Sequence, residues 1–359
     1  REKGYYVNTV AIPYYDDTLG GMISGVIGGG YPLYSSSFGL DNKDILGLKV
    51  VLPTGRIIET NGRGVNVTSK HLYPFMRETG SPDMTGMFIG DGGLFGIKTE
   101  ATLAFHQIPP HWASGAWLFS NFENAYAAMY DFSKSPEGLC DYLTILSPEI
   151  TEIYTSKGNP DKSWGLVYYV QGFDRSEIHT KFSGAHLGFQ KRGSTLDMGG
   201  LNEFSKGMRT GEAYWKKNQY SETLRKRASC AFFASSETFP NLFQQLYSNL
   251  KSRAERSESY FKKKLSTSCV IHLVVRNCVW ANLILNYESD EDSSVAYEII
   301  RDVHRLGANL GATFEAHGGY AADLMGANWS NNFREMMLSI KRALDPNDIL
   351  NPGLWFSEI

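Results

Sequence analysis

The stretch that decides the fold reads IGDGGLFGIKTEA and covers residues 89–101. It is rich in glycine, and the residues from Gly96 to Phe105 are β-favouring and alternate in polarity. Glycine lacks a Cβ and therefore lets the backbone come close to another group. Alternation with a period of two is typical of a strand. The sequence predicts a tight glycine loop that leads into a strand over residues 96–105.

A hairpin is predicted upstream of this loop. The segment ILGLKVVLPTG, residues 45–55, is an apolar stretch that ends in a Pro-x-Gly turn, and the short apolar segment 57–59 follows it. This pattern is typical of a β-hairpin, in which a strand, a tight turn and a second short strand follow one another. Nearer the N-terminus, TLGGMIS (residues 18–24) opens a second glycine cluster, which extends through Gly30.

The pattern changes after Pro109 and Pro110, which stop strand pairing and predict a domain boundary. Beyond them, short strands alternate with amphipathic helices, which we expect over residues 123–132, 176–189, 240–251 and 293–306. Gly307 is predicted to end the last of these helices, because glycine is favoured just past a helix end. The glycine- and charge-rich segment 193–216 predicts a loop, and no repeat of fixed period is apparent.

The composition excludes several classes of protein. Of the 359 residues, 42% are hydrophobic and 20% are charged, which excludes a disordered chain. A net charge of −3 argues against a nucleic-acid binder held by bulk charge. No apolar run approaches the roughly 20 residues that a transmembrane helix needs. The four cysteines show no CxxC spacing, which favours reduced thiols and a cytoplasmic location.

Three motifs occur in an order that resembles a known class of flavoproteins. They are the TLGGMIS segment with the hairpin after it, the glycine loop of residues 89–101, and the C-terminal stretch LDPNDILNPG of residues 344–353. Together they resemble FAD-linked oxidases of the vanillyl-alcohol-oxidase type, nearest the glycolate oxidase and D-lactate dehydrogenase branch. The resemblance implies an α+β fold, with a partial FAD-binding domain of this (PCMH) type and a ferredoxin-like α+β cap domain.

The resemblance also implies a division of the chain and a cofactor. Residues 1–110 would form the second half of the FAD-binding domain, residues 111–335 the substrate or cap domain, and residues 336–359 a segment that returns to the flavin domain. The expected FAD-binding residues are Gly20, Gly21, Gly39, Gly90, Gly92, Gly96, Ile97 and Asn351. Glycines at such positions let backbone N–H groups reach phosphates. The same glycines are also compatible with tight turns of a β-rich domain that binds no ligand.

The first half of the family's flavin domain has no counterpart in the sequence. That half begins with an Arg-Gly-Gly-Gly-Thr-type loop for the pyrophosphate, and nothing here matches it. We therefore expect that a partner protein supplies this half, that the chain is a fragment, or that it does not bind FAD tightly. A protein that accepts electrons is the other expected partner.

A metal site is not expected. Hydroxy-acid members of the family carry a His-x-Gly-Asp-Gly-Asn-x-His segment whose histidines bind a divalent metal. The best match runs from Asn277 to Ile284, and Asn282 fits the motif. Asn277 and Ile284 take the two histidine positions, and neither side chain is an imidazole ligand. Trp280 takes the aspartate position, where a large ring would fill the space of the metal and could face an aromatic or acyl substrate.

A catalytic histidine is predicted near the C-terminus. The segment EAHGGY, residues 315–320, resembles a Glu-His-Gly segment in which the family's histidine accepts the substrate proton. His317 matches that position, and Glu315 and Tyr320 are the next candidates for a catalytic role. Histidine titrates near neutral pH and is therefore suited to accept a hydroxyl proton. A structural histidine in a glycine-rich turn is the other interpretation.

The resemblance implies an FAD-dependent oxidoreductase acting on CH–OH donors. Its small-molecule substrate would be an alcohol or a 2-hydroxy acid-like compound that passes a hydride to the flavin. Two alternatives stay open: an oxidase of phenolic or aromatic alcohols, and a non-catalytic subunit that keeps the fold within a larger assembly. Nucleic-acid binding is not expected, and assembly into a homo-oligomer remains open.

Overall fold

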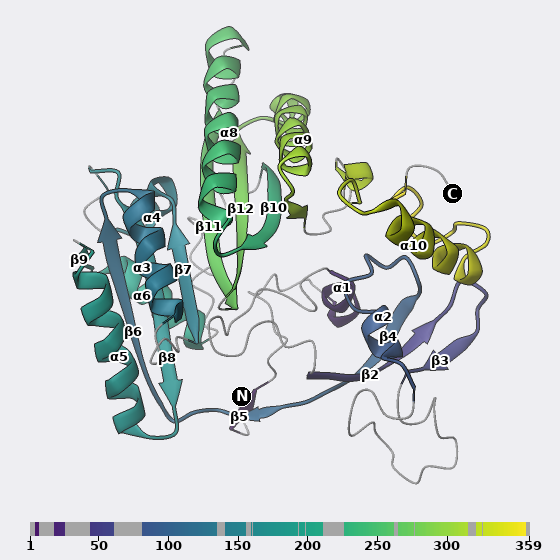
Figure 1. The fold of residues 1–359 in the computed structure, drawn as a ribbon, viewed down its shortest axis with the longest axis horizontal. Coiled ribbons are helices and arrows are strands. Elements are labelled where there is room, and N and C mark those ends of the chain that lie inside the picture. Colours follow the sequence, from purple (N-terminus) through teal and green to yellow (C-terminus); the bar gives the residue numbers. More distant parts are fainter. Residues whose placement is uncertain are drawn as a thin grey trace. The chain divides into compact units, whose positions relative to one another are not determined.

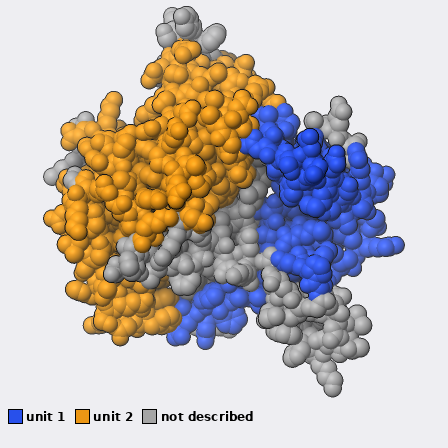
Figure 2. Space-filling view, in the orientation of Figure 1, with its two compact units in different colours: residues 1–32, 40–108, 315–359 blue, residues 33–39, 109–314 orange. Residues whose placement is uncertain are grey.

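The computed structural model describes residues 4–6, 18–25, 44–60, 81–134, 141–155, 159, 161–192, 194–197, 199–210, 226–261, 265–275, 277–314, 321–324 and 326–356. The chain divides into two compact units (Figure 2). Unit 1 comprises residues 1–32, 40–108 and 315–359, and unit 2 comprises residues 33–39 and 109–314. Among the described residues, no helix combines the length and apolarity needed to span a membrane.

Unit 1 contains a three-stranded antiparallel sheet with strand order β3-β2-β4. The strands are β2 (Ile45–Val51), β3 (Ile57–Glu59) and β4 (Ile97–Leu103). The turn between β2 and β3 uses Gly55 at a φ of 79°, a left-handed conformation that glycine adopts without a steric penalty. The predicted hairpin and the predicted strand after the glycine loop are both confirmed.

The rest of unit 1 supports this sheet. Its other elements are β1 (Tyr5–Tyr6), α1 (Leu19–Ser24), α2 (Met84–Met87), β5 (His106–Gln107), the 3₁₀ helix η4 (Ala322–Leu324) and α10 (Asn331–Leu344). Strand β1 pairs with β5. Ile23 of α1, Val50 of β2, Phe88 and Leu94 are fully buried, so the glycine loop is anchored by apolar residues from several parts of unit 1.

Unit 2 contains an eight-stranded sheet with the order β13-β10-β12-β11-β7-β8-β6-β9. The strands are β6 (His111–Phe119), β7 (Tyr142–Leu146), β8 (Trp164–Gly172), β9 (Thr195–Leu196), β10 (Arg227–Ser235), β11 (Leu265–Val275), β12 (Cys278–Tyr287) and β13 (Thr313–Phe314). Neighbouring strands pair antiparallel, and β7 joins β11 in the middle of the sheet.

The unit 2 sheet consists of two similar modules. The first runs β6-α3-β7-β8-α5-β9 and the second β10-α8-β11-β12-α9-β13, and both have the strand order 4-1-3-2 of a ferredoxin-like fold (Figure 1). The four module helices are α3 (Phe122–Lys134), α5 (Arg175–Gln190), α8 (Phe239–Phe261) and α9 (Ser293–Asn309). Three further short elements are α4 (Pro148–Tyr154), α6 (Gly200–Thr210) and the 3₁₀ helix η3 (Asp290–Asp292).

The module helices pack on one face of the sheet. The ring of Phe232 in β10 lies 5.9 Å from that of Phe239 in α8, and Trp117 in β6 lies 6.3 Å from Phe189 in α5. Successive residues of a strand point to opposite faces. The residues next to Phe232 and Trp117 along their strands therefore point to the other face, which we call the open face because none of the four module helices covers it. The helices α4 and α6 pack against part of this face.

Candidate functional site

In unit 1 the glycine loop is fixed by the end of α1. The backbone N–H of Gly90 donates to the carbonyl of Ile23 at 2.9 Å, and that of Gly92 donates to the carbonyl of Ser24 at 2.8 Å. Gly90, Gly92 and Gly93 all have positive φ, at 66°, 62° and 75°. Such conformations are costly for residues with a side chain, so the turn itself requires these glycines.

At three of the glycines expected to bind FAD, the space that a side chain would need is filled by other parts of the chain. A Cβ at Gly92 would lie 2.5 Å from Cδ2 of Leu354, and a Cβ at Gly20 would lie 2.7 Å from the carbonyl oxygen of Lys98. A Cβ at Gly96 would lie 2.3 Å from Cγ1 of Val50. Close approach is therefore required at all three positions, but the approaching group is protein.

Gly21 is different, and it provides the test of whether the described residues fit a cofactor. Among the described residues, a Cβ there would meet only the Thr18 hydroxyl oxygen, at 3.1 Å, and Gly21 is exposed. That hydroxyl already caps α1 by accepting the Gly21 N–H at 3.1 Å. An exposed glycine at the start of a helix leaves room for an anionic group, so this position fits a flavin phosphate.

A buried ion pair stiffens the loop between Gly90 and β4. The Asp91 carboxylate accepts hydrogen bonds from the N–H groups of Gly93 and Phe95, at 2.9 and 3.2 Å, and from the Lys98 ammonium. Burial raises the pKa of Asp91 and lowers that of Lys98, while the attraction between the two groups opposes both shifts. The pair holds the loop in one conformation because each charge would be costly to leave alone.

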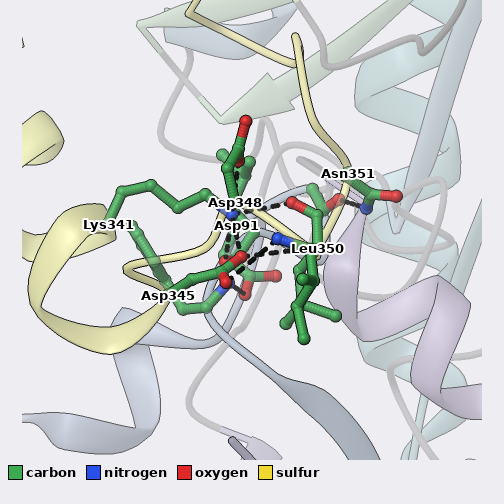
Figure 3. A network of polar contacts seen from close by, with 10 residues as sticks. Asp91, Lys341, Asp345, Asp348, Leu350 and Asn351 are labelled. Carbon is green, nitrogen blue, oxygen red and sulfur yellow. Dashed lines mark hydrogen bonds and ion pairs between the residues drawn. The ribbon is translucent and has the colours of Figure 1, made fainter. Parts of the chain in front are cut away.

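The C-terminal motif is held around one buried lysine (Figure 3). Nζ of Lys341, in α10, lies 2.5 Å from Oδ2 of Asp345 and 3.2 Å from Oδ1 of Asp348. The same ammonium donates to the carbonyl of Leu350 at 2.7 Å and to that of Leu94 at 3.4 Å. Lys341 therefore connects α10, the C-terminal motif and the glycine loop within unit 1.

Three further hydrogen bonds complete this arrangement around Lys341, which we call the clamp. Asp345 accepts from the N–H groups of Ile349 and Leu350, at 3.0 and 2.9 Å. Burial alone would raise the pKa of Asp345, but these bonds and Lys341 outweigh it and lower the pKa. Nδ2 of Asn351 donates to the carbonyl of Gly92 at 2.5 Å, so a residue of the third motif contacts the second motif directly.

The structure describes only some of the other residues that the sequence predicts for the site. Ile97 starts β4 and is 57% exposed. Gly39 and the three expected catalytic residues, Glu315, His317 and Tyr320, lie outside the described residues.

In unit 2 a row of rings crosses the open face of the sheet. Tyr169 of β8 stacks on Tyr142 of β7 at 5.5 Å between ring centroids. Tyr142 lies 5.7 Å from His272 of β11, and His272 lies 5.1 Å from Trp280 of β12. We call these four residues the aromatic row. All four are buried, and Trp280, singled out by the sequence, is its end member.

His272 is the polar member of the aromatic row. Its Nδ1 atom is hydrogen-bonded to the Thr144 hydroxyl, and burial lowers its pKa to about 3. The imidazole is therefore neutral at ordinary pH. Asn277 lies in the turn between β11 and β12, while Asn282 and Ile284 follow Trp280 on the same face of β12. Among the described residues, no group of three or more His, Cys, Asp and Glu side chains is arranged to hold a metal.

Asp141, beside the aromatic row, leads to a prediction about pH. Its Oδ2 accepts from the N–H of Gln171 at 2.7 Å, and burial raises its pKa to about 6 from 3.8. The folded state thus holds a proton that the unfolded state releases, and stability falls as pH rises from 3.8 to about 6. Asp141→Asn is expected to raise the free energy of unfolding at neutral pH by up to about 3 kcal/mol.

Urea unfolding of wild type and variant checks this expectation. The gain should shrink as pH falls through the window and disappear below it, because Asp141 is then protonated in both states. Asp161→Asn, at an exposed position, is the control and should change little at either pH. A gain for Asp141→Asn of the same size at acidic and neutral pH would show that ionisation is not its cause.

Comparison with known proteins places the chain in a family. Residues 108–354 match the model of FAD linked oxidases, C-terminal domain. That range contains 247 of the 359 residues, and the chain belongs to this family. The family is FAD-linked, so the expected cofactor is confirmed at the level of the family, as is the resemblance to this class of oxidases.

Similar proteins include enzymes and uncharacterised relatives. An uncharacterised FAD-linked oxidoreductase of Mycobacterium tuberculosis is 30% identical over 112 residues, which are 31% of this chain and 21% of that protein. The mitochondrial cytochrome-type D-lactate dehydrogenase of Arabidopsis thaliana is 22% identical over 324 residues, which are 88% of this chain and 53% of that protein. The chain therefore spans about a fifth to about half of these two relatives.

Solved structures show the fold. A 4-ethylphenol oxidase of Gulosibacter chungangensis superposes with a TM-score of 0.69 at 17% identity, covering 92% of this chain and 69% of that one. A substrate-bound p-cresol methylhydroxylase superposes with a TM-score of 0.67 at 16% identity, covering 93% and 67%. The predicted α+β fold of the PCMH type is confirmed.

Sequence reasoning missed three site residues. Lys98 and Lys341 lie within or beside the quoted motifs, and His272 lies five residues before the segment that matches the metal motif. A signal was present for Lys341, since it precedes Asp345 by four residues, the spacing of a helical ion pair. His272 had no such signal, because it is brought to Trp280 by the pairing of β11 with β12.

Proposed function

We propose that the chain is the FAD-binding and substrate-binding part of an oxidoreductase acting on CH–OH donors. The observation that carries the proposal is the contact between Asn351 and Gly92, which joins two of the three ordered motifs in a chain of the FAD-linked oxidase family. The buried clamp around Lys341 supports it, because charges are buried in this way where a loop must keep one conformation.

The flavin contacts are proposed for the residues named from the sequence. Gly21 would lie against a phosphate, and the fixed loop with Gly90, Gly92 and Gly96 would form a rigid support. Gly20 keeps α1 close to β4, and Ile97, exposed where β4 begins, would cover an apolar part of the cofactor. When bound, FAD supplies the acceptor for a hydride.

The proton chemistry is proposed for the segment of residues 315–320. His317 would accept the hydroxyl proton of the substrate as the carbon–hydrogen bond is broken, because a neutral imidazole is a base near neutral pH. Glu315 and Tyr320 would orient this histidine or replace it.

The substrate is proposed to be an alcohol, and two kinds of relative suggest different alcohols. One relative is named for D-lactate, and two solved neighbours are named for p-cresol and 4-ethylphenol. The aromatic row favours the second kind, an aromatic or phenolic alcohol, because stacked rings recognise a flat apolar body.

A domain division and a partner belong to the proposal. We assign residues 1–110 and 336–359 to the flavin domain and residues 111–335 to the substrate domain. Related structures extend well beyond the matched region, since the chain covers 67–69% of them. The remaining part of the flavin domain would then come from further polypeptide, in the same protein or in a partner, and a second protein or oxygen would accept the electrons.

Gly21→Val tests the proposed phosphate contact. The valine side chain would occupy the open space beside Thr18, and FAD affinity is expected to fall at least about tenfold, or about 1.4 kcal/mol. Fluorescence titration of the apoprotein with FAD measures this change. The fold should persist, because no other described atom lies within 4 Å of the added Cβ.

Gly188→Val is the matched control. Gly188 is also helical and also has open space at its Cβ position, but it lies in unit 2. Its FAD affinity should equal that of wild type. If Gly21→Val bound FAD as tightly as Gly188→Val, Gly21 would not be a cofactor contact.

A further inference from the structure

Asn282 lies in the middle of β12, on the open face of the unit 2 sheet. Its neighbour Ala281 pairs with Phe232, whose ring packs on Phe239 of α8, so Ala281 points to the helix-covered face. Asn282 points the other way, together with Trp280 and the aromatic row. It lies directly between Ala231 of β10 and Val270 of β11, with Ile284 as its other neighbour along the strand.

The carboxamide oxygen of Asn282 is buried without a hydrogen-bond partner among the described residues. The residue as a whole is 5% exposed. A buried amide in this state costs stability, so native proteins keep one mainly where a ligand or an ordered water completes it. Asn159 of the same unit shows the ordinary situation: it donates to two carbonyls, those of Pro148 and Ser163, and accepts from the Ser163 N–H.

The surroundings of Asn282 restrict which kind of ligand could hydrogen-bond to its Oδ1 atom. Ala231, Val270 and Ile284 are apolar, Trp280 is uncharged, and the next polar group of the aromatic row, His272, is neutral at ordinary pH. None of these neighbours could balance a carboxylate, and burying a charge without a partner is strongly unfavourable. A carboxamide oxygen instead requires a hydrogen-bond donor, which a hydroxyl group provides.

We propose that Asn282 is a substrate-binding residue that receives the hydroxyl group of an uncharged ligand whose flat body lies against Trp280. This inference rests on the proposed function and narrows it: the substrate class is an uncharged aromatic alcohol or phenol. A 2-hydroxy acid is disfavoured at this position, because none of the neighbours named above carries the positive charge that would balance its carboxylate.

Two variants with the same substitution test the proposal. Asn282→Leu removes a carboxamide whose oxygen is unpaired and keeps the volume, so the melting temperature should stay the same or rise. Asn159→Leu removes an amide with three hydrogen bonds, so the melting temperature should fall. Thermal unfolding of the holoprotein gives both values.

Ligand affinity decides the assignment. Phenol has a hydroxyl and a ring but no oxidisable CH–OH group, and oxalate represents the carboxylate-bearing 2-hydroxy acids. Calorimetry on the wild-type holoprotein should detect phenol binding and no oxalate binding. Asn282→Leu should weaken phenol binding at least about tenfold, and Asn159→Leu should leave it unchanged.

The contrary outcomes are distinct. Phenol affinity that is unchanged in Asn282→Leu would overturn the proposal whatever the melting temperature, because the amide would then be satisfied by water or by protein. Oxalate binding tighter than phenol binding would overturn the substrate class and leave the oxidoreductase proposal standing. If no alcohol reduced the bound flavin, the proposed function itself would fail, and the phenol result would be judged separately.

Discussion

Lys341→Met is expected to lower the free energy of unfolding by about 3–5 kcal/mol, because it removes the cation from a buried ion cluster. Asp345 is buried beside Lys341, and Asp348 shares the same ammonium. With methionine at this position, the two carboxylates would face each other without compensation. The link to the Leu94 and Leu350 carbonyls would also be lost, so the glycine loop should loosen and FAD affinity should fall. Denaturant unfolding of the apoprotein measures the stability, and titration measures the affinity.

Two variants separate the buried charge from the loss of side-chain volume. Arg342→Met, at the next and exposed position, should change stability by less than about 0.5 kcal/mol. Lys341→Met combined with Asp345→Asn should recover part of the loss, because one uncompensated charge is then removed. Equal stability of Lys341→Met and Arg342→Met would contradict the role assigned to the cluster.

His317→Ala is expected to slow reduction of the bound flavin by about 10²–10⁴-fold, the usual effect of removing a general base. The FAD content and the melting temperature should stay near those of wild type, because the proposed role is chemical. The rate should also rise with pH in wild type as the imidazole loses its proton. Anaerobic stopped-flow mixing with an alcohol gives the rate per bound flavin.

An exposed histidine offers the control for this measurement. His179→Ala, on α5 of unit 2, should reduce the flavin as fast as wild type. If His317→Ala were equally fast, the catalytic role would be wrong, and Glu315 or Tyr320 would be the next residue to replace. A lower melting temperature with an unchanged rate would indicate a structural histidine in a turn.

The sequence predicted elements well where local chemistry decides them. The hairpin of β2 and β3 follows from Pro53 and Gly55, and Gly55 does adopt the left-handed conformation. The end of α9 was predicted wrongly. Gly307 lies inside the helix, where a Cβ would meet the Phe314 ring at 2.9 Å, and Gly311 at a φ of 85° follows the true end. Gly307 is needed for packing and Gly311 for the turn, and the sequence alone does not distinguish these two roles.

Two features of unit 2 depend on tertiary structure. The segment 193–216 was predicted to be a loop, but α6 forms over Gly200–Thr210, with Leu201 and Phe204 buried. The two ferredoxin-like modules were not apparent as a repeat, because their likeness lies in strand order. Packing against the sheet stabilises α6 although the helix begins with glycine. The shared strand order of the two modules produces no periodic pattern in the amino-acid sequence.

In the candidate site, too, some features follow from local sequence and others depend on tertiary structure. The sequence predicted close approach at the glycines of residues 89–101, and at Gly92 and Gly96 the approaching groups are Leu354 and Val50, so their need for glycine is explained by packing within the chain. The aromatic row could not be foreseen beyond Trp280, because the pairing of four strands assembles it. Local motifs thus indicated the family, whereas side chains from different strands create the surface proposed to bind substrate.

The most direct test of this account is the visible spectrum of the purified holoprotein during anaerobic addition of an uncharged aromatic alcohol. The account predicts one bound FAD per chain, bleached in proportion to the alcohol added and restored when an electron acceptor is admitted. Bound FAD that no alcohol reduces, or a chain that binds no FAD even with the rest of its flavin domain present, would contradict it and indicate a non-catalytic subunit.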